Sequence, residues 1–205
     1  IAKQDKAVAL RIAPLLTKTN PNKNFFSKLN FRPAPIHIHA ERTWNLDISK
    51  DQESLLKEMR KTTRHAIKKA ASRTDLKTEI ITGPSIANRF WPLYLATSAR
   101  HNFTPFSQQF ISDQVNLFSK SDRIFMTVVS HNKKDVAGAI IVCYGKTAFY
   151  HHGASIKLPS SLPASHLVQW QSILEAQKRG IERYNFWGIE PAGSTNHPFK
   201  GITVF

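Results

Sequence analysis

The sequence has one cysteine, no long apolar run and few acidic residues. Because Cys143 stands alone among 205 residues, a disulfide framework and a C-x-x-C site are both excluded, and a reducing compartment is expected. No apolar run approaches the roughly 18 residues of a membrane-spanning helix, and no signal-peptide pattern is present. We therefore predict a cytoplasmic protein, with peripheral contact to the anionic inner face of the membrane as a further expectation.

The shortage of acidic residues leaves a strongly basic chain. Fourteen Asp and Glu against 29 Lys and Arg give a formal charge of +15. That balance favours a polyanionic partner, which includes nucleic acid, an anionic membrane surface and a phosphate-bearing substrate. A hydrophobic content of 41% and an aromatic content of 10% indicate a folded protein of one or two domains.

Several motifs of established chemistry are absent. The sequence contains no Walker A loop, no G-x-G-x-x-G, no G-x-S-x-G and no H-E-x-x-H. His37 and His39 share a strand face at i, i+2, whereas His151 and His152 are adjacent and are expected on opposite faces. Acidic ligands are sparse near these histidines, so we predict no metal site and no cofactor.

Apolar periodicity and turn residues predict an α+β chain that is mixed rather than doubly wound. Residues 1–43 are expected to hold a buried strand at 8–16, a short amphipathic helix at 24–31 and the start of a strand spanning 35–49. The remaining elements are predicted as a helix from about 49 to 73, a strand near 77–82, helices at 85–102 and 107–119, strands at 123–131, 136–144 and 147–155, a helix at 164–178 and a strand containing Tyr184 and Phe186.

The helix predicted over residues 49–73 separates an apolar face from a basic one. Asp47 or Ser49 is placed to cap it, with Gln52 or Glu53 making the reciprocal contact. The inward face is predicted as Leu55, Met59, Thr62, Ala66 and Ala70, and the cationic face as Lys57, Lys61, Arg64 and Lys68. The cationic face is interpreted either as a solvated surface or as a phosphate contact.

Four ordered segments carry a resemblance to a known family. They are "YHHGAS" at 150–155, "LVQW" at 167–170, "NFWG" at 185–188 and "HPFKG" at 197–201. This order resembles the FemABX family of GNAT-like aminoacyl transferases, in which a Y-x-G-A-S-like strand end, an L-L-Q-W-like helix start, a D-F-W-G-like strand end and H-P-x-x-G follow one another. A second stretch, residues 43–70, looks like the family's T-x-x-L-D-L-S opening followed by its basic helix.

The resemblance implies a GNAT-like α+β fold whose mixed, mostly antiparallel sheet is flanked by helices. It implies that residues 44–205 form a second GNAT-like domain and that residues 1–43 are the C-terminal remnant of a first. From its first and last residues we expect a fragment, incomplete at both ends. A lysine implicated near the family's transfer centre is accordingly expected just after Phe205.

The function implied by the resemblance is transfer of an amino acid from aminoacyl-tRNA to the amine of a peptidoglycan precursor, either lipid-linked or UDP-linked. Lys157 replaces the arginine that the family usually places in the loop after G-A-S. Arg64 and Lys68 are assigned to phosphate or tRNA, and no residue is assigned to catalysis. The expected substrate-binding residues, which we predict to converge on one pocket between splayed strands, are Tyr150, His152, Lys157, Gln169, Trp170 and Trp187.

Two other functions stay open on the sequence. An acyl-CoA-dependent GNAT N-acyltransferase normally carries a glycine-rich pyrophosphate loop before its long helix, whereas "KLPSSLPASH" has no glycine. A non-catalytic RNA-binding domain needs only a basic face and aromatics, but no RRM, KH or zinc-knuckle signature is present. A basic face that borders a deep pocket favours transfer over binding alone.

Overall fold

The computed structural model describes residues 7–12, 16, 19–34, 42–159 and 161–190. Contacts between residues divide the chain into two units, Ile1–Glu41 and Arg42–Phe205. In the first unit, α1 (Asn20–Lys28) begins at Thr19, whose hydroxyl accepts a hydrogen bond from the Asn22 N–H. This confirms the short helix predicted there.

The buried strand predicted over residues 8–16 is wrong for the residues that the structure describes. Residues 8–12 and 16 lie outside any strand and are exposed. An apolar segment forms a stable strand only when it joins a sheet, and the sheet described below takes no strand from this unit. The segment predicted over 35–49 lies partly outside the described residues, and its second half forms the strand β1.

A six-stranded sheet forms the centre of the second unit, in the order β1-β6-β5-β4-β3-β2. Neighbouring strands are antiparallel, except for the parallel pair β5 and β6. The predicted mixed, mostly antiparallel sheet is therefore confirmed. The strands are β1 (Thr43–Asp47), β2 (Leu76–Ile81), β3 (Ile124–His131), β4 (Lys134–Tyr144), β5 (Thr147–Ser155) and β6 (Arg183–Gly188).

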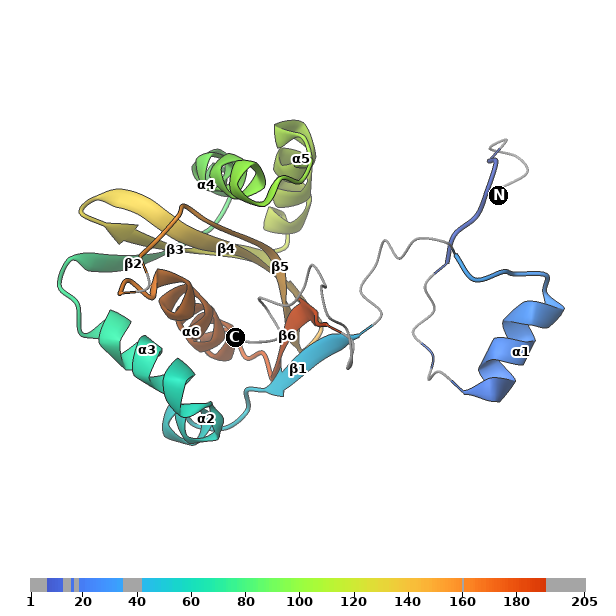
Figure 1. Ribbon diagram of the computed structural model, residues 1–205, viewed down its shortest axis with the longest axis horizontal. Helices are drawn as coiled ribbons and strands as arrows, with labels where there is room; N and C mark the ends of the chain where they lie inside the picture. The colour runs from blue at the N-terminus through green and yellow to red at the C-terminus, as the bar shows by residue number, and fades with distance from the viewer. Residues whose placement is uncertain (1–6, 13–15, 17–18, 35–41, 160, 191–205) are drawn as a thin grey trace. The chain divides into compact units, whose positions relative to one another are not determined.

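Helices cover both faces of this sheet (Figure 1). On one face α6 crosses the strands and packs beside α3, while α4 and α5 cover the opposite face. None of the helices in the described residues is long and apolar enough to cross a bilayer. The helices of this unit are α2 (Gln52–Glu58), α3 (Lys61–Ala71), α4 (Ser85–His101), α5 (Gln108–Ser119) and α6 (Ala164–Lys178).

Two tight turns join β3, β4 and β5 into the predicted meander. Asn132 and Lys133 have φ values of 50° and 65°, the pair of positive values that a two-residue hairpin turn of type I′ requires. Gly145, with φ of 56°, turns β4 into β5. The three strands pair in sequence and antiparallel, which confirms the expectation from their alternating pattern.

The single helix predicted over residues 49–73 is two helices. Met59 adopts an extended backbone, with ψ of 153°, and separates α2 from α3. Asp51 caps α2, because its carboxylate accepts a hydrogen bond from the Ser54 N–H at 2.9 Å. Asp47 is not available for that role, since its carboxylate accepts the N–H and hydroxyl of Ser49.

The break also shifts the inward face of the basic segment. Leu55 and Ala70 are buried, as predicted, but Thr63 and Ile67 take the inward positions that had been assigned to Thr62 and Ala66. Because an extended residue interrupts the 3.6-residue period, the register of the face cannot continue across Met59. Of the predicted cationic face, Lys57, Lys61 and Lys68 are exposed and Arg64 is half-buried.

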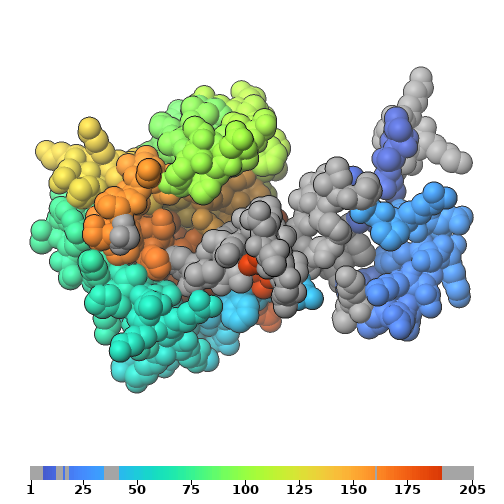
Figure 2. Space-filling model, viewed as in Figure 1, coloured from blue at the N-terminus to red at the C-terminus, as the bar shows by residue number. Residues whose placement is uncertain are grey.

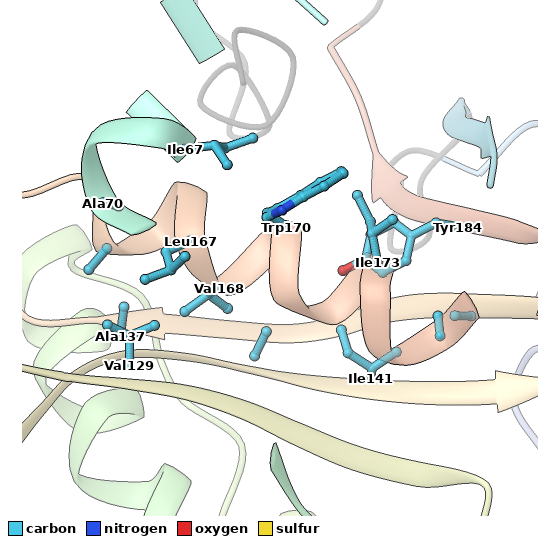
Figure 3. Packing of buried hydrophobic residues seen from close by; sticks show 14 of the residues in the cluster. Ile67, Ala70, Val129, Ala137, Ile141, Leu167, Val168, Trp170, Ile173 and Tyr184 are labelled. Atoms are coloured by element: carbon cyan, nitrogen blue, oxygen red, sulfur yellow. The ribbon is translucent and has the colours of Figure 1, made fainter. Parts of the chain in front are cut away.

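The larger of the two apolar clusters lies between the sheet and the α3–α6 layer (Figure 3). Trp170 is 6% exposed and belongs to this cluster, together with Ile67 of α3. Burying a ring of this size contributes on the order of 2–3 kcal/mol to folding. Trp170 is thus part of the core, on the side of α6 that faces away from the strands (Figure 3).

Candidate active site

β5 and β6 separate after a short parallel pairing. Among the described residues, β5 and β6 pair only over Thr147–Phe149 and Arg183–Asn185, so from Tyr150 onwards no described strand pairs with β5 on that side. A cavity of about 310 Å³ occupies this end of β5. Its lining residues are Thr97, Arg100, His101, Ala137, Gly138, Tyr150, Gly153, Ala154, Ser155, Ser165, Val168, Gln169 and Phe186.

A β-bulge in β5 sets which side chains reach the cavity. Ile140 is opposite His152 and Ile141 is opposite Tyr150, so His151 is an extra residue in β5. Tyr150 consequently packs against the α6-side cluster, whereas His152 contacts rings on the α4 side. The predicted convergence of His152 with Tyr150 on one pocket is wrong, because one inserted residue reverses the alternation of side chains along the strand.

Tyr150 lies over Gly153 on the cavity wall. A methyl group at position 153 would overlap the Tyr150 hydroxyl, so the ring depends on this glycine for its place. Burial raises the pKa of Tyr150 above 10, an effect that the neighbouring Gln169 side chain reduces. The phenol is therefore protonated at neutral pH and keeps an O–H group that is able to donate a hydrogen bond.

Gln169 is held in orientation by a buried tyrosine. The Tyr184 hydroxyl donates to Gln169 Oε1 at 2.8 Å. Tyr184 is fully buried, and burial raises its pKa well above 10, so this hydroxyl also stays protonated. With Oε1 engaged, the amide presents its NH₂ group as the remaining donor at the cavity wall.

The C-terminal end of α4 forms another wall of the cavity. Arg100 donates from Nη2 to Ser155 Oγ at 3.0 Å and from Nη1 to the carbonyl of Ile156. The Thr97 hydroxyl accepts the Ser155 N–H at 2.8 Å. Sequence reasoning missed Arg100, because the residues that bring it to the site lie 55 or more positions away and give no local signal.

His152 is enclosed by α4 and α5 on the opposite face from Tyr150. Its ring lies 6.0 to 6.2 Å from the rings of Phe90, Tyr94 and Phe106, and Nε2 lies 3.1 Å from Gln114 Oε1. Burial, and secondarily the neighbouring His151, lower its pKa to about 3. Its ring is therefore neutral at physiological pH and stays outside the cavity lining.

Trp187 was predicted to line the pocket, but Phe186 lines it instead. Trp187 has φ of 67°, a left-handed conformation that is uncommon for a bulky residue. Asn185 Oδ1 stabilises this turn by accepting the Trp187 N–H at 2.7 Å. The strained backbone ends the strand alternation and brings the Trp187 ring against Phe149 and His151 instead.

The remaining predicted residues lie away from the cavity lining. Trp170 is in the core, and Lys157 is exposed in the segment after β5. Lys68 is exposed on α3, whereas Arg64 is half-buried and donates from Nη1 to the carbonyls of Leu56 and Lys57, both at 3.2 Å. Of the six predicted substrate-binding residues, the structure thus brings Tyr150 and Gln169 to the cavity.

No group of His, Cys, Asp and Glu side chains suited to a metal ion occurs among the residues with a described placement. Cys143 is buried, and burial raises the pKa of its thiol to about 11.

The polar groups on the cavity wall include the neutral donors of Tyr150 and Gln169 and the guanidinium of Arg100. Such a set suits stabilisation of a developing oxyanion and positioning of a substrate.

The sequence matches the model of the acetyltransferase (GNAT) domain over residues 57–201. The chain belongs to this GNAT family. The match includes α3, the meander and α6, and with them the strands whose separation forms the cavity. No curated protein matches the GNAT chain in sequence.

Solved structures confirm a FemABX-like form of the GNAT fold. FemX superposes with a TM-score of 0.76 and 13% identity, over 90% of this chain and 64% of FemX. The C-terminal domain of a putative lysylphosphatidylglycerol synthetase from Agrobacterium fabrum superposes with a TM-score of 0.55 and 14% identity, over 73% of this chain and 47% of that one. L-PGS from Bacillus licheniformis superposes with a TM-score of 0.52 and 10% identity, over 75% of this chain and 49% of L-PGS.

Gly153→Ala should displace Tyr150 without unfolding the domain, because the overlapping atoms are the far end of a side chain that can rotate. One tyrosine should then move from a raised pKa to about 10 in an ultraviolet titration. Gly138→Ala is the matched control, since a methyl group there meets Met126 and not Tyr150. An unchanged titration of Gly153→Ala would show that Tyr150 does not depend on this glycine.

His152 should make the protein less stable as the pH falls. The folded pKa of about 3 lies below the unfolded value of 6.5, so below pH 6.5 the unfolded state binds a proton that the folded state excludes. Between pH 6 and 4, His152→Phe should reduce the slope of unfolding free energy against pH by up to about 1.4 kcal/mol per unit. Urea denaturation at several pH values measures both slopes, and equal slopes would contradict the burial of a neutral His152.

Proposed function

We propose that this GNAT domain transfers an amino acid from aminoacyl-tRNA to an amine on a peptidoglycan precursor. The observation that carries the proposal is the cavity at the separated strands, where a neutral Tyr150 and an oriented Gln169 lie side by side on the wall. The family motifs that contain these two residues, and the FemX-like fold, support the same reaction. The chain spans less than two thirds of FemX, so the activity is proposed for the whole protein.

The reaction replaces an ester by an amide. The neutral amine of the acceptor attacks the carbonyl carbon of the aminoacyl ester and forms a C–N bond, and the C–O ester bond breaks when the tetrahedral intermediate collapses. The proton lost by the attacking nitrogen passes to the ribose oxygen of the tRNA, which leaves as a hydroxyl group. Negative charge develops on the carbonyl oxygen during the attack, and hydrogen-bond donors fixed at that point lower the barrier. We assign the Tyr150 hydroxyl and the Gln169 NH₂ to this oxygen.

Basic side chains suit the two polyanionic substrates. Arg100 lies on the cavity wall, and Lys157 follows β5, where a phosphate of the acceptor would approach. Lys68 and Arg64 on α3 are proposed to contact tRNA phosphates. The two backbone bonds of Arg64 use only Nη1, which leaves its other donors for phosphate. The charge of +15 favours association with both substrates and with an anionic membrane surface.

The second candidate is an acyl-CoA-dependent N-acyltransferase, favoured by the match to the acetyltransferase (GNAT) domain itself. The segment before α6 argues against it. α6 follows Pro163, and the residues between β5 and α6 include no glycine, so that segment lacks the flexible backbone with which a phosphate-binding loop wraps a pyrophosphate. A direct comparison of donors separates the two candidates.

The test supplies the full-length protein with a peptidoglycan precursor and either charged tRNA or acetyl-CoA, and scores products by mass. We expect a mass increase of one amino acid with charged tRNA only. Tyr150→Phe should lower kcat by about 100-fold, because one oxyanion donor is removed, and leave KM nearly unchanged. Leu117→Ala, an exposed substitution on α5, is the control.

A product that carries an acetyl group would replace this proposal with the second candidate. An unaltered kcat in Tyr150→Phe would remove Tyr150 from the assigned role even if transfer occurs. A raised KM at constant kcat would show instead that the hydroxyl binds substrate equally in the ground and transition states.

A further inference from the structure

An aromatic surface lies beside the cavity, at the end of α4 and the start of α5. Phe103 is 40% exposed, Phe106 is 53% exposed and Phe110 is 41% exposed. Three of the six exposed aromatic side chains in the described part of the second unit therefore gather within eight residues. We call Phe103, Phe106 and Phe110 the aromatic platform. In Figure 2, α4 and α5 form one continuous surface in green.

The platform is built from rings held at fixed positions. Phe106 and Phe110 stack at 4.7 Å between centroids, with 28° between their planes. Phe106 also packs edge-on against the half-buried ring of His152. Phe103 contacts Tyr94, and its carbonyl accepts the Ser98 hydroxyl at 2.5 Å. The exposed ring faces are thus preorganised, which reduces the entropy lost on binding a flat ligand.

Charge is nearly absent from this surface, in contrast to the rest of the chain. Between Ser85 and Ser119 the exposed side chains include one acid, Asp113, which accepts a hydrogen bond from Gln109 at 2.8 Å. Arg100 is the one exposed Lys or Arg in the same segment, and it stands at the cavity. Polar amides such as Gln108 and Asn116 make up much of the remainder.

The platform follows the cavity wall closely along the chain. Arg100 and His101 line the cavity, and Phe103 follows them after Asn102, which ends α4 in a left-handed conformation with φ of 53°. Phe103 is thus three residues from Arg100, and the Phe106–Phe110 stack comes next in the sequence. The chemical order along the chain from the cavity wall is one cation followed by aromatic rings.

We propose that the aromatic platform binds unpaired nucleobases at the single-stranded 3′ end of the donor RNA by stacking. Single-stranded RNA is recognised by stacking on aromatic rings, with arginine contributing to the backbone and the bases. An anionic bilayer would need a cluster of Lys and Arg around the rings, whereas between Ser85 and Ser119 Arg100 is the one exposed Lys or Arg. The inference rests on the proposed function, because it assigns the path of the donor substrate.

The test measures binding of a 5′-fluorescein-labelled, unstructured RNA hexamer to the full-length protein by fluorescence anisotropy. Phe106→Ala should weaken binding at least about fivefold, because one base loses its stacking partner. Phe106→Trp should restore the affinity of the parent, since an aromatic face returns. Leu117→Ala is the matched control, because it removes an exposed aliphatic side chain of α5 and should change affinity less than twofold.

A second probe separates stacking from charge. An abasic hexamer of the same length carries the same phosphates without bases, so the parent and Phe106→Ala should bind it equally. Equal losses on the normal and abasic hexamers would overturn the proposal in favour of a phosphate contact. A loss in Leu117→Ala as large as that in Phe106→Ala would overturn it in favour of general apolar contact.

Two further readouts test the other occupants of this surface. The first readout is light scattering, which measures the oligomeric state. A dimeric parent and a monomeric Phe106→Ala would assign the platform to self-association. Parent binding to phosphatidylglycerol vesicles that Phe106→Ala abolishes would assign it to a membrane. Either result, with hexamer binding unchanged, would overturn the nucleobase proposal.

The hexamer assay needs no transfer activity, so it stands apart from the proposed function. Normal transfer by Phe106→Ala, with an unchanged KM for charged tRNA, would overturn the platform and leave the proposed function intact. Hexamer binding that depends on Phe106, in a protein that transfers nothing from charged tRNA, would support the platform as an RNA site and contradict the transferase.

Discussion

One inserted residue in β5 determines how the two faces of the sheet are used. The bulge at His151 places Tyr150 and Gly153 on the α6 face and His152 on the α4 face. The bulge occurs just where the hydrogen bonds between β5 and β6 end, so the side-chain alternation of β5 reverses at the point where these two strands separate. Bulges commonly re-aim side chains beside active sites, and here the residue delivered to the cavity is Tyr150.

Distant parts of the chain then complete the site around that edge. Tyr184 of β6 orients Gln169 of α6 by a hydrogen bond. Arg100 and Thr97 of α4 bond to Ser155 at the end of β5. The bonds from Arg100 and Thr97 to Ser155 join residues 55 and 58 positions apart, whereas Tyr184 and Gln169 are 15 positions apart. The cavity is therefore a product of tertiary packing, and its polar groups are fixed before any substrate arrives, as efficient electrostatic catalysis requires.

Local patterns in the sequence were sufficient for the meander, for α6 and for the α4–α5 pair, because their turns and periodicity are carried by neighbouring residues. The FemABX-like motifs supplied Tyr150 and Gln169, which line the cavity. The local patterns failed at Met59 and Arg60, where two extended residues split a continuous helical pattern, and at His151, where strand alternation reverses. Trp170 was misassigned because an aromatic beside a motif gives no indication of whether it faces a cavity or the core. Arg100 carried no signal, since only the fold brings it to β5. Phe186 belonged to the N-F-W-G segment, but its neighbour Trp187 was assigned to the pocket instead.

The central claim is that the carbonyl of the donor binds at Tyr150 and Gln169, in the opening between β5 and β6. The most direct measurement is a crystal structure of the full-length protein bound to an aminoacyl-adenosine analogue with an amide in place of the ester. The account predicts that the analogue's carbonyl oxygen lies within hydrogen-bond distance of Tyr150 Oη and Gln169 Nε2. An analogue bound on the α4 side against His152, or beside Trp187 with its carbonyl remote from Tyr150, would contradict it.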